Sequence, residues 1–327
     1  MTQIILPLAV AALALTFGVA AAPAQAGNPG AEGTAEPALI APLPPQRQKL
    51  GYGRLTSNDV IGEHTDRWRT GSVSSSRAWG YRWDGAAPAA LGDILELRLQ
   101  GQVMTPENLG AVNPNDRPFA GALSVGLHSH AQFSGLDLTL GADLVVIGPQ
   151  TGLDDFVGAV HDLLDAPQAS NAVLAGQVGN QVRPTVVAEI GRSYDLGGQV
   201  YLRPFAEARA GDETLLRAGA DVTFGRIGQG GLLAREQVTG HRYRVIYAWA
   251  PGTSFVLGGD LAYVENSVYL PSGRGYALED TRARLRAGLH WQGSRASLFY
   301  GLTYLSEEFS TQPEGQVTGS LRVKFRF

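Results

Sequence analysis

The chain ends in the stretch Leu321-Arg322-Val323-Lys324-Phe325-Arg326-Phe327, in which apolar and basic side chains alternate. Successive side chains of a β-strand point to opposite faces, so this stretch predicts a strand with one apolar face and one charged face. Such a strand fits two kinds of antiparallel sheet. One is a soluble sandwich, and the other is a closed barrel whose apolar face contacts lipid and whose charged face lines a wet lumen.

The same alternation recurs earlier in the chain. Apolar and polar side chains interleave in residues 94–100, 136–140, 242–249 and 284–289. A period of two over such lengths is typical of half-buried strands. The last strand is therefore one of many similar strands.

Short polar turns separate these strands, at Asp84-Gly85, Ser134-Gly135, Asp195 to Gly198 and Gln292-Gly293-Ser294. From Lys49 onward the pattern predicts about twelve strands. Ala250-Pro251-Gly252 is either a tight turn or a bulge within one long strand. An even strand number favours the bulge, because it keeps both ends of the barrel domain on the same side of the membrane.

The N-terminus carries the features of an export signal. Ile4 to Ala22 is apolar, and Ala24-Gln25-Ala26 has the small residues at which signal peptidase cleaves, so we expect a cleaved signal peptide over residues 1–26. An uncleaved membrane helix is the alternative. Residues 27–48, rich in Pro, Ala and Gly, predict a flexible periplasmic segment. No later window offers the ~20 apolar residues that a spanning helix requires.

Export and alternating strands together favour the barrel over the sandwich. In hydrocarbon no water satisfies the backbone, so a span that is not helical has to be a closed sheet. A terminal aromatic residue such as Phe327 also resembles the assembly signal of bacterial outer-membrane proteins. We therefore expect residues 49–327 to form an all-β, closed antiparallel transmembrane β-barrel of about twelve strands in the bacterial outer membrane, among outer-membrane lipids.

Composition excludes several classes of function. The chain has 327 residues, a formal net charge of −4 and no cysteine. Disulfide scaffolds, thiol catalysis and cysteine-held metal sites are therefore excluded, and without a clustered basic run no nucleic-acid partner is expected. A serine nucleophile is unsupported because the sequence lacks a G-x-S-x-G motif.

One long connection, from Pro149 to Val182, departs from the strand pattern. Its apolar residues recur at helical spacing and are Leu153, Phe156, Val160, Leu163 and Leu164. This spacing predicts a short amphipathic helix. Counting strands from the N-terminus places the helix in an extracellular loop.

Polar residues flank the first predicted turn. Thr56-Ser57-Asn58-Asp59 ends the first strand, and the second opens with Thr65-Asp66-Arg67-Trp68-Arg69-Thr70-Gly71. By strand parity both groups lie at the outer rim. On spacing alone, Asn and Asp at a strand end are more often turn residues than catalytic ones.

Three sequence blocks resemble the LpxR family of outer-membrane lipid A 3′-O-deacylases. They are Asn58-Asp59 with Asp66-Arg67-x-x-Thr70-Gly71, then Asp116-Arg117-Pro118-Phe119, then Val146-Ile147-Gly148-Pro149 leading to His161. The blocks occur in family order. The strands after His161 match the family only as generic barrel strands.

The resemblance implies an esterase that removes the 3′-linked acyloxyacyl group of lipid A, the membrane anchor of lipopolysaccharide. It implies His161 as the general base, a site lined by Asn58, Asp59 and Thr70, and a divalent cation, calcium, for which Asp59 is the best candidate to bind or orient the ion. Imidazole can deprotonate water near neutral pH, and a hard cation with oxygen ligands can stabilise an oxyanion. A monomer is expected.

The sequence also departs from the family pattern. Val157 stands where the family often has glutamine, Pro167 stands where it has an acidic residue, and residues 104–115 offer no counterpart of a family lysine. These changes leave open a catalytically silent barrel, either a narrow pore or a structural protein. An outer-membrane phospholipase is a third possibility.

Overall fold

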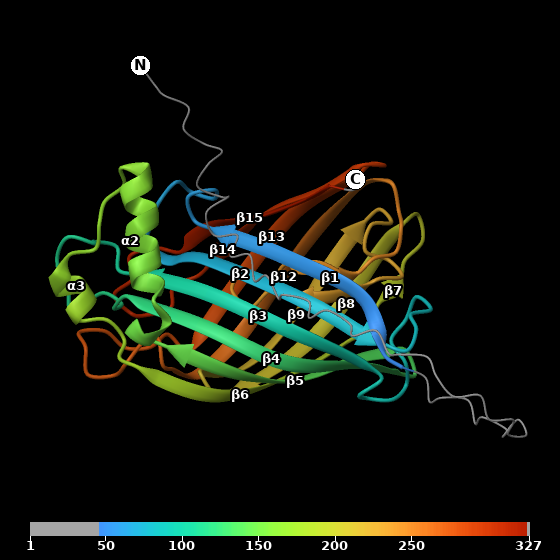
Figure 1. Cartoon of the computed structure of the whole chain (residues 1–327), viewed down its shortest axis with the longest axis horizontal. Coiled ribbons are helices and arrows are strands. Elements are labelled where there is room, and N and C mark those ends of the chain that lie inside the picture. The colour runs from blue at the N-terminus through green and yellow to red at the C-terminus, as the bar shows by residue number, and fades with distance from the viewer. Residues whose placement is uncertain (1–45, 326–327) are drawn as a thin grey trace, which may run out of the picture.

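The computed structural model describes residues 46–325 and forms a closed antiparallel barrel (Figure 1). Within that range one sheet has the strand order β6-β5-β4-β3-β2-β1-β15-β14-β13-β12-β9-β8-β7, and pairing of β6 with β8 closes the ring. β7 (Tyr194–Asp195) has only two residues, so twelve strands of the described part form the wall, as predicted. The predicted signal peptide, nearly all of the periplasmic segment and Phe327 lie outside the described residues.

The wall strands are β1 (Gln48–Asn58), β2 (Trp68–Gly80), β3 (Ile94–Thr105), β4 (Ala120–Phe133), β5 (Leu136–Ile147), β6 (Gln181–Gly191), β8 (Val200–Ala210), β9 (Glu213–Phe224), β12 (Gly252–Ser267), β13 (Thr281–Gln292), β14 (Ala296–Leu305) and β15 (Gln316–Phe325). The strands predicted at 94–100, 136–140 and 284–289 lie in β3, β5 and β13. Apolar side chains such as Leu261 and Leu285 are exposed on the outer face, and none of the helices in residues 46–325 is long and apolar enough to cross a membrane.

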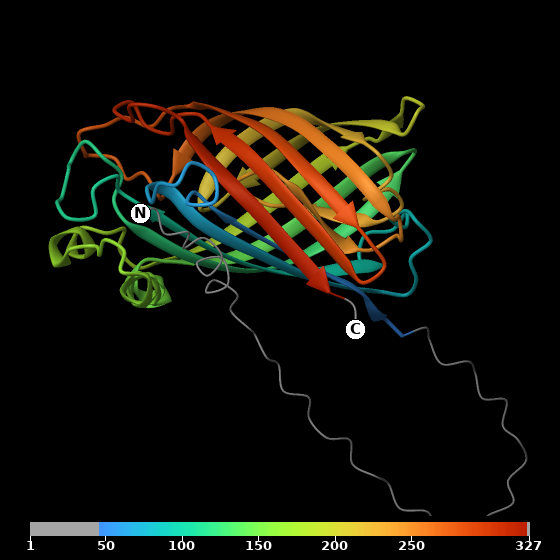
Figure 2. The same ribbon diagram turned by 90° about the horizontal axis from the view of Figure 1, so that it is seen from above.

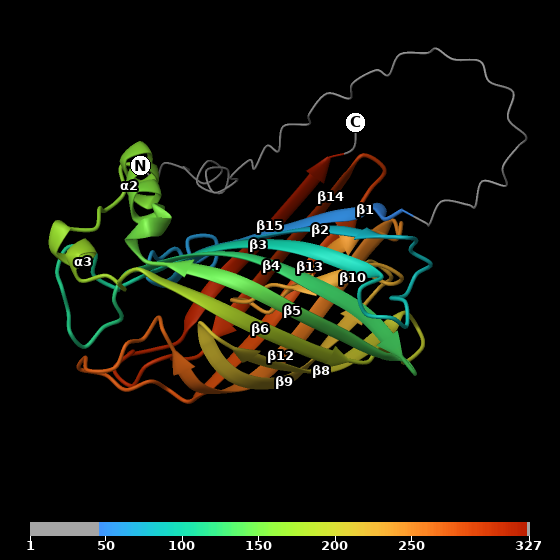
Figure 3. The ribbon, with the colours of Figure 1, turned by 60° about the horizontal axis from the view of Figure 1, so that its bottom comes forward.

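The strand predicted at 242–249 is not part of the wall. The connection between β9 and β12 folds back into the barrel as a hairpin of β10 (Leu232–Arg235) and β11 (Arg242–Ile246), which pair only with each other in a separate sheet (Figure 3). The predicted bulge at Ala250-Pro251-Gly252 is therefore wrong, because β12 begins anew at Gly252. A two-stranded hairpin with one face on the wall shows the same alternation as a wall strand.

The hairpin fills much of the lumen. Tyr243 and Val245 of β11 pack against Leu55 of β1 and other inward-facing residues. Gly51 and Gly53 of β1 make this approach possible: a Cβ atom at Gly51 would lie 2.1 Å from the carbonyl oxygen of Val245. The hairpin and the wall strands that face it therefore form a packed core inside the barrel.

Three short helices lie in the connection between β5 and β6, at the end of the barrel opposite the strand termini Gln48 and Phe325 (Figures 1 and 2). They are the 3-10 helix η1 (Pro149–Thr151), α2 (Leu153–Leu164) and α3 (Asn171–Ala175). α2 confirms the predicted helix. Of the apolar residues that predicted the helix, Leu153 is buried, whereas Leu163 is 77% exposed. We call the end with α2 the outer end and the opposite end the periplasmic end.

Candidate functional site

α2 lies against the outside of the barrel wall at the outer end. Leu153 and Val157 pack on Leu123 of β4 and Val103 of β3, in a cluster that also holds Phe119. Leu123 shares its strand face with lipid-facing residues, so the helix covers the outer surface of the wall and not the lumen. Val157 thus has a packing role where the family often has a polar residue.

His161 follows Leu153 and Val157 on the same face of α2, one further turn along the helix. It is 8% exposed. Its Nδ1 lies 2.6 Å from the carbonyl oxygen of Pro167, and its Nε2 lies 3.1 Å from Oδ2 of Asp66. A carbonyl oxygen only accepts hydrogen bonds, so Nδ1 carries a proton and Nε2 is the nitrogen that exchanges one.

The Asp66 carboxylate raises the pKa of His161 through its hydrogen bond, partial burial opposes this, and the bond to Pro167 raises it further. The main-chain oxygen of Pro167 therefore orients the imidazole at the position where an acidic side chain is missing. The imidazole of His161 therefore stays oriented although Pro167 replaces the acidic residue of the family pattern.

Asp66 joins the helix to the opening hairpin. Thr105 Oγ1 donates to the carbonyl oxygen of Asp66 at 3.4 Å, and the hydroxyls of Thr70 and Thr105 are hydrogen-bonded at 2.7 Å. Thr105 lies on the same face of β3 as Val103, which α2 covers. The structure thus connects His161 to Thr70 through Asp66 and Thr105, on the lipid-facing side of the wall.

Asp59 is fully buried just after β1, and its contacts run toward the lumen side. Its Oδ2 accepts hydrogen bonds from the main-chain nitrogen of Arg67 at 2.8 Å and from Nε2 of Gln316 at 3.3 Å. Its main-chain nitrogen donates to the carbonyl oxygen of Thr70 at 3.1 Å. Within the described residues it makes no direct hydrogen bond or ion pair with His161. Asp66 is the acidic group between them.

Burial raises the pKa of Asp59 to about 9, and the nearby charge of Asp66 adds to the effect. Oδ1 of Asp59 and Oδ1 of Asp66 are both buried, and neither has a hydrogen-bond partner among residues 46–325. A buried carboxylate oxygen without a hydrogen-bond partner is a suitable ligand for a hard divalent cation. However, no group of three or more His, Asp or Glu residues in the same range is arranged to hold a metal.

Asn58 has a local role in the structure. Its Oδ1 accepts a hydrogen bond from the main-chain nitrogen of Val60 at 2.8 Å, which shapes the turn after β1. By strand alternation its side chain lies on the face opposite the buried, inward-facing Ser57. Asn58 is therefore on the lipid-facing side, the side that carries Thr105 and α2.

Sequence reasoning missed Asp66 and Pro167 as partners of His161. Asp66 belongs to the first family-like motif, but no role was predicted for it. Pro167 acts through its main-chain oxygen, which a motif of side chains cannot predict. The αL conformation of Asp165, with φ of 53°, ends α2 and lets the chain turn back so that Pro167 reaches the ring. An acidic residue shortly before a strand and a helix-ending turn after a histidine are the only signals of this arrangement in the sequence.

Comparison with known proteins gives one family and one similar fold. A family model described as outer membrane protein LpxR matches residues 10–327. LpxR from Salmonella typhimurium aligns with a TM-score of 0.69 and 18% sequence identity, over 85% of this chain and 100% of that chain. At this identity the structural match shows a shared fold.

Other matches are more distant. The translocator domain of the autotransporter NalP from Neisseria meningitidis has a TM-score of 0.40 at 11% identity, over 85% of this chain and 88% of that chain. The NanC porin has a TM-score of 0.39 at 8% identity, over 85% and 100%. Neither carries a functional argument, and no curated protein matches the sequence. Because its family match covers nearly the whole chain, the protein belongs to the LpxR family of outer-membrane proteins.

Proposed function

We propose that this protein is a lipid A 3′-O-deacylase that acts in the outer leaflet of the outer membrane. The observation that carries the proposal is the place of His161: an oriented imidazole lies between a helix and the lipid-facing side of the wall, at the outer end of the barrel. An ester of a membrane lipid can reach such a site without leaving the bilayer. Family membership supports the choice of lipid A, in lipopolysaccharide, as the substrate.

In this proposal Nε2 of His161 removes a proton from water, because Nδ1 is bound to Pro167. The water oxygen bonds to the ester carbonyl carbon, the bond from that carbon to the sugar oxygen breaks, and the proton passes to the departing sugar hydroxyl. Asp66 Oδ2 contacts Nε2 at 3.1 Å in this structure, so the water has to take its place at that nitrogen, and the nearby carboxylate then stabilises the imidazolium that forms between these two steps. Asn58 and Thr70 line the same side of the wall and position the substrate.

We further propose calcium as the cofactor and Asp59 as its protein ligand, on the evidence of the unpartnered Oδ1 of that carboxylate. When bound, the cation would supply positive charge for the oxyanion of the reaction. Without three clustered acidic or histidine side chains among residues 46–325, the other ligands would be main-chain oxygens, water or the substrate itself. The protein is proposed to act as a monomer after removal of residues 1–26.

Mass spectrometry of lipid A from cells with and without the protein tests the proposal. Expression should remove the mass of the 3′ acyloxyacyl group when calcium is present, and His161→Asn should abolish the change. Asn is chosen because its amide nitrogen can still donate to Pro167 while no proton acceptor replaces Nε2. Unchanged lipid A in cells with folded, surface-located protein would refute the proposal, and fatty acid released from phosphatidylethanolamine instead would indicate a phospholipase.

The pore alternative finds no support in the interior. The β10–β11 hairpin occupies the lumen, and near the outer end Glu308 binds Arg69 at 2.6 Å, Arg117 at 2.6 Å and Arg282 at 3.0 Å. A conducting pathway would have to break these buried ion pairs.

A further inference from the structure

A cavity of about 370 Å³ lies inside the barrel at its periplasmic end. Its walls include Trp83 and Gly85 between β2 and β3, Gly135 between β4 and β5, and the start of the lumen hairpin at residues 227–231. These connections are all at the end opposite α2. The cavity is thus reached from the periplasm.

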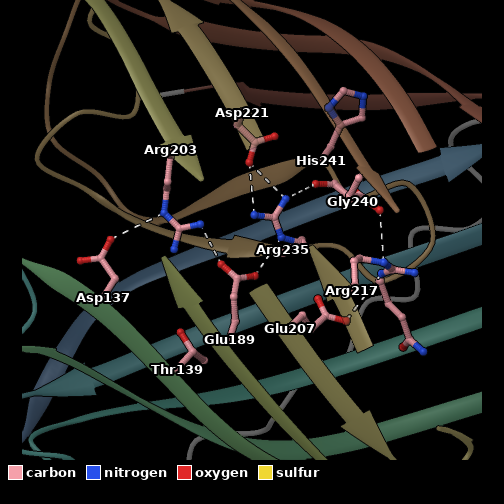
Figure 4. Close-up of polar contacts among 12 residues, drawn as sticks. Asp137, Thr139, Glu189, Arg203, Glu207, Arg217, Asp221, Arg235, Gly240 and His241 are labelled. Carbon is pink, nitrogen blue, oxygen red and sulfur yellow. Dashed lines mark hydrogen bonds and ion pairs between the residues drawn. The ribbon is translucent and has the colours of Figure 1, made fainter. Parts of the chain in front are cut away.

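Six arginines line this cavity. Five of them pair with a carboxylate: Arg98 with Glu96 at 2.9 Å, Arg203 with Glu189 at 2.8 Å, Arg209 with Asp212 at 2.7 Å, Arg235 with Glu189 at 2.8 Å and Arg286 with Asp221 at 2.6 Å. Figure 4 shows Glu189 and Asp221 among these guanidinium groups. The sixth, Arg242, has no side-chain hydrogen bond or ion pair with any residue of the described chain.

The position of Arg242 makes this lack of a partner costly. Arg242 of β11 lies directly across the hairpin from Arg235 of β10. Like charges in such a cross-strand pair repel each other. The nearest carboxylates, Glu189 and Asp221, are already bonded to Arg203, Arg235 and Arg286, so they cannot also neutralise Arg242 fully.

We propose that the periplasmic cavity binds a phosphate-sized oxyanion through Arg242. A tetrahedral oxyanion accepts two parallel hydrogen bonds from one guanidinium, and it would offset the repulsion between Arg242 and Arg235. The anion is a free one and not a lipid headgroup, because the cavity lies within the wall and not on its lipid-facing surface. Bound there, the anion would tie the hairpin to the periplasmic turns.

Isothermal titration of the full-length protein in detergent with inorganic phosphate tests this site, at constant ionic strength maintained with chloride and in the presence of a chelator. Wild-type protein should bind phosphate, and Arg242→Gln should weaken binding by about tenfold or more, as expected for loss of a charge-assisted bidentate contact. Arg242→Lys, which keeps the charge but not the fork, should fall between the two.

The matched control is Arg82→Gln. Arg82 is also at the periplasmic end, but its side chain is 83% exposed and pairs with Asp84 outside the cavity. The Arg82→Gln variant should bind phosphate as the wild type does. The proposal is overturned if wild-type protein does not bind phosphate, or if Arg242→Gln binds it equally well. If circular dichroism shows that Arg242→Gln does not fold, the test uses Arg242→Lys instead. Equal phosphate binding by Arg242→Lys and the wild type then overturns the proposal.

Discussion

Acidic side chains are buried both in the lumen and at the outer-end site, but the two regions differ in how far their carboxylate oxygens are satisfied. In the lumen, Asp260 is bonded to Arg217, Arg284 and Arg286 together. At the site, one oxygen of Asp59 and one of Asp66 lack a partner in the described chain. Paired charges of the first kind hold a structure together, whereas unsatisfied acidic groups beside a histidine are typical of a functional site.

The largest effect is expected from removing the proton acceptor at the outer-end site. His161→Asn should lower deacylation by about 10²- to 10⁴-fold, the usual contribution of a general base, because Nε2 is lost. The unfolding temperature should fall only modestly, since the pair with Asp66 is lost but the amide can keep the bond to Pro167. Initial rates on purified lipid A measure the effect. His64→Asn, at an exposed histidine of the β1–β2 loop, is the control and should keep full activity.

A lumen substitution should have the opposite outcome. Glu308→Gln leaves Arg69, Arg117 and Arg282 without their shared carboxylate and should destabilise the barrel by about 3 to 5 kcal/mol, as expected for breaking a buried ion pair. Thermal unfolding in detergent measures it. Protein that remains folded should deacylate normally.

The control for this change is Glu307→Gln, at the neighbouring residue, whose side chain makes no ion pair within residues 46–325. It should leave the unfolding temperature unchanged. If Glu308→Gln abolishes activity in folded protein, the lumen network cannot be purely structural and the contrast between the two regions fails.

Removing the Asp59 charge should change both metal dependence and stability. Asp59→Asn should raise the calcium concentration needed for activity by about tenfold or more, because even indirect partners of a metal ion contribute that much. Asp155→Asn, on the exposed side of α2, should not.

When calcium is chelated, Asp59→Asn should make the protein more stable, not less. The pKa of Asp59 is about 9 in the fold, well above its ordinary value, so its ionised form is disfavoured there and folding loses stability as the pH rises from the ordinary value toward 9. In EDTA at neutral pH the Asp59→Asn variant, whose amide side chain is uncharged, should therefore unfold at a higher temperature than the wild type. Equal unfolding temperatures would contradict a destabilising buried carboxylate at Asp59.

The wall of the barrel was predictable because several of its strands share a two-residue period. Strands β3, β5 and β13 and the turn at Ser134-Gly135 follow directly from it. The lumen hairpin was not, because Tyr243 and Val245 alternate as wall residues do. Gly51 and Gly53, on the inward face of β1, were the signal that another backbone passes close by.

The site was predictable only as a set of residues and not as an arrangement. Resemblance to a family brought His161, Asn58, Asp59 and Thr70 together on the basis of motif order. The structure links His161 directly to Asp66 instead. This contact joins two loops far apart in sequence, so neither periodicity nor spacing could have predicted it.

The smallest predicted effect concerns this contact. Asp66 raises the pKa of His161, and the ring must be neutral at Nε2 to accept a proton, so activity should fall as the pH drops through that raised pKa. Asp66→Asn removes the carboxylate and should move the acid limb of the pH–rate profile to lower pH. The Asp66–His161 ion pair stabilises the fold at low pH, and this contribution is lost as the pH rises through the pKa of His161. The Asp66→Asn variant should lack this contribution to stability.

The control is Asp162→Asn, at the exposed acidic residue next to His161, which should leave the pH–rate profile unchanged. An acid limb at the same pH in Asp66→Asn and the wild type would mean that Asp66 does not control the proton on the imidazole, and the unpartnered oxygen of Asp66 would then have no connection with the chemistry of the site.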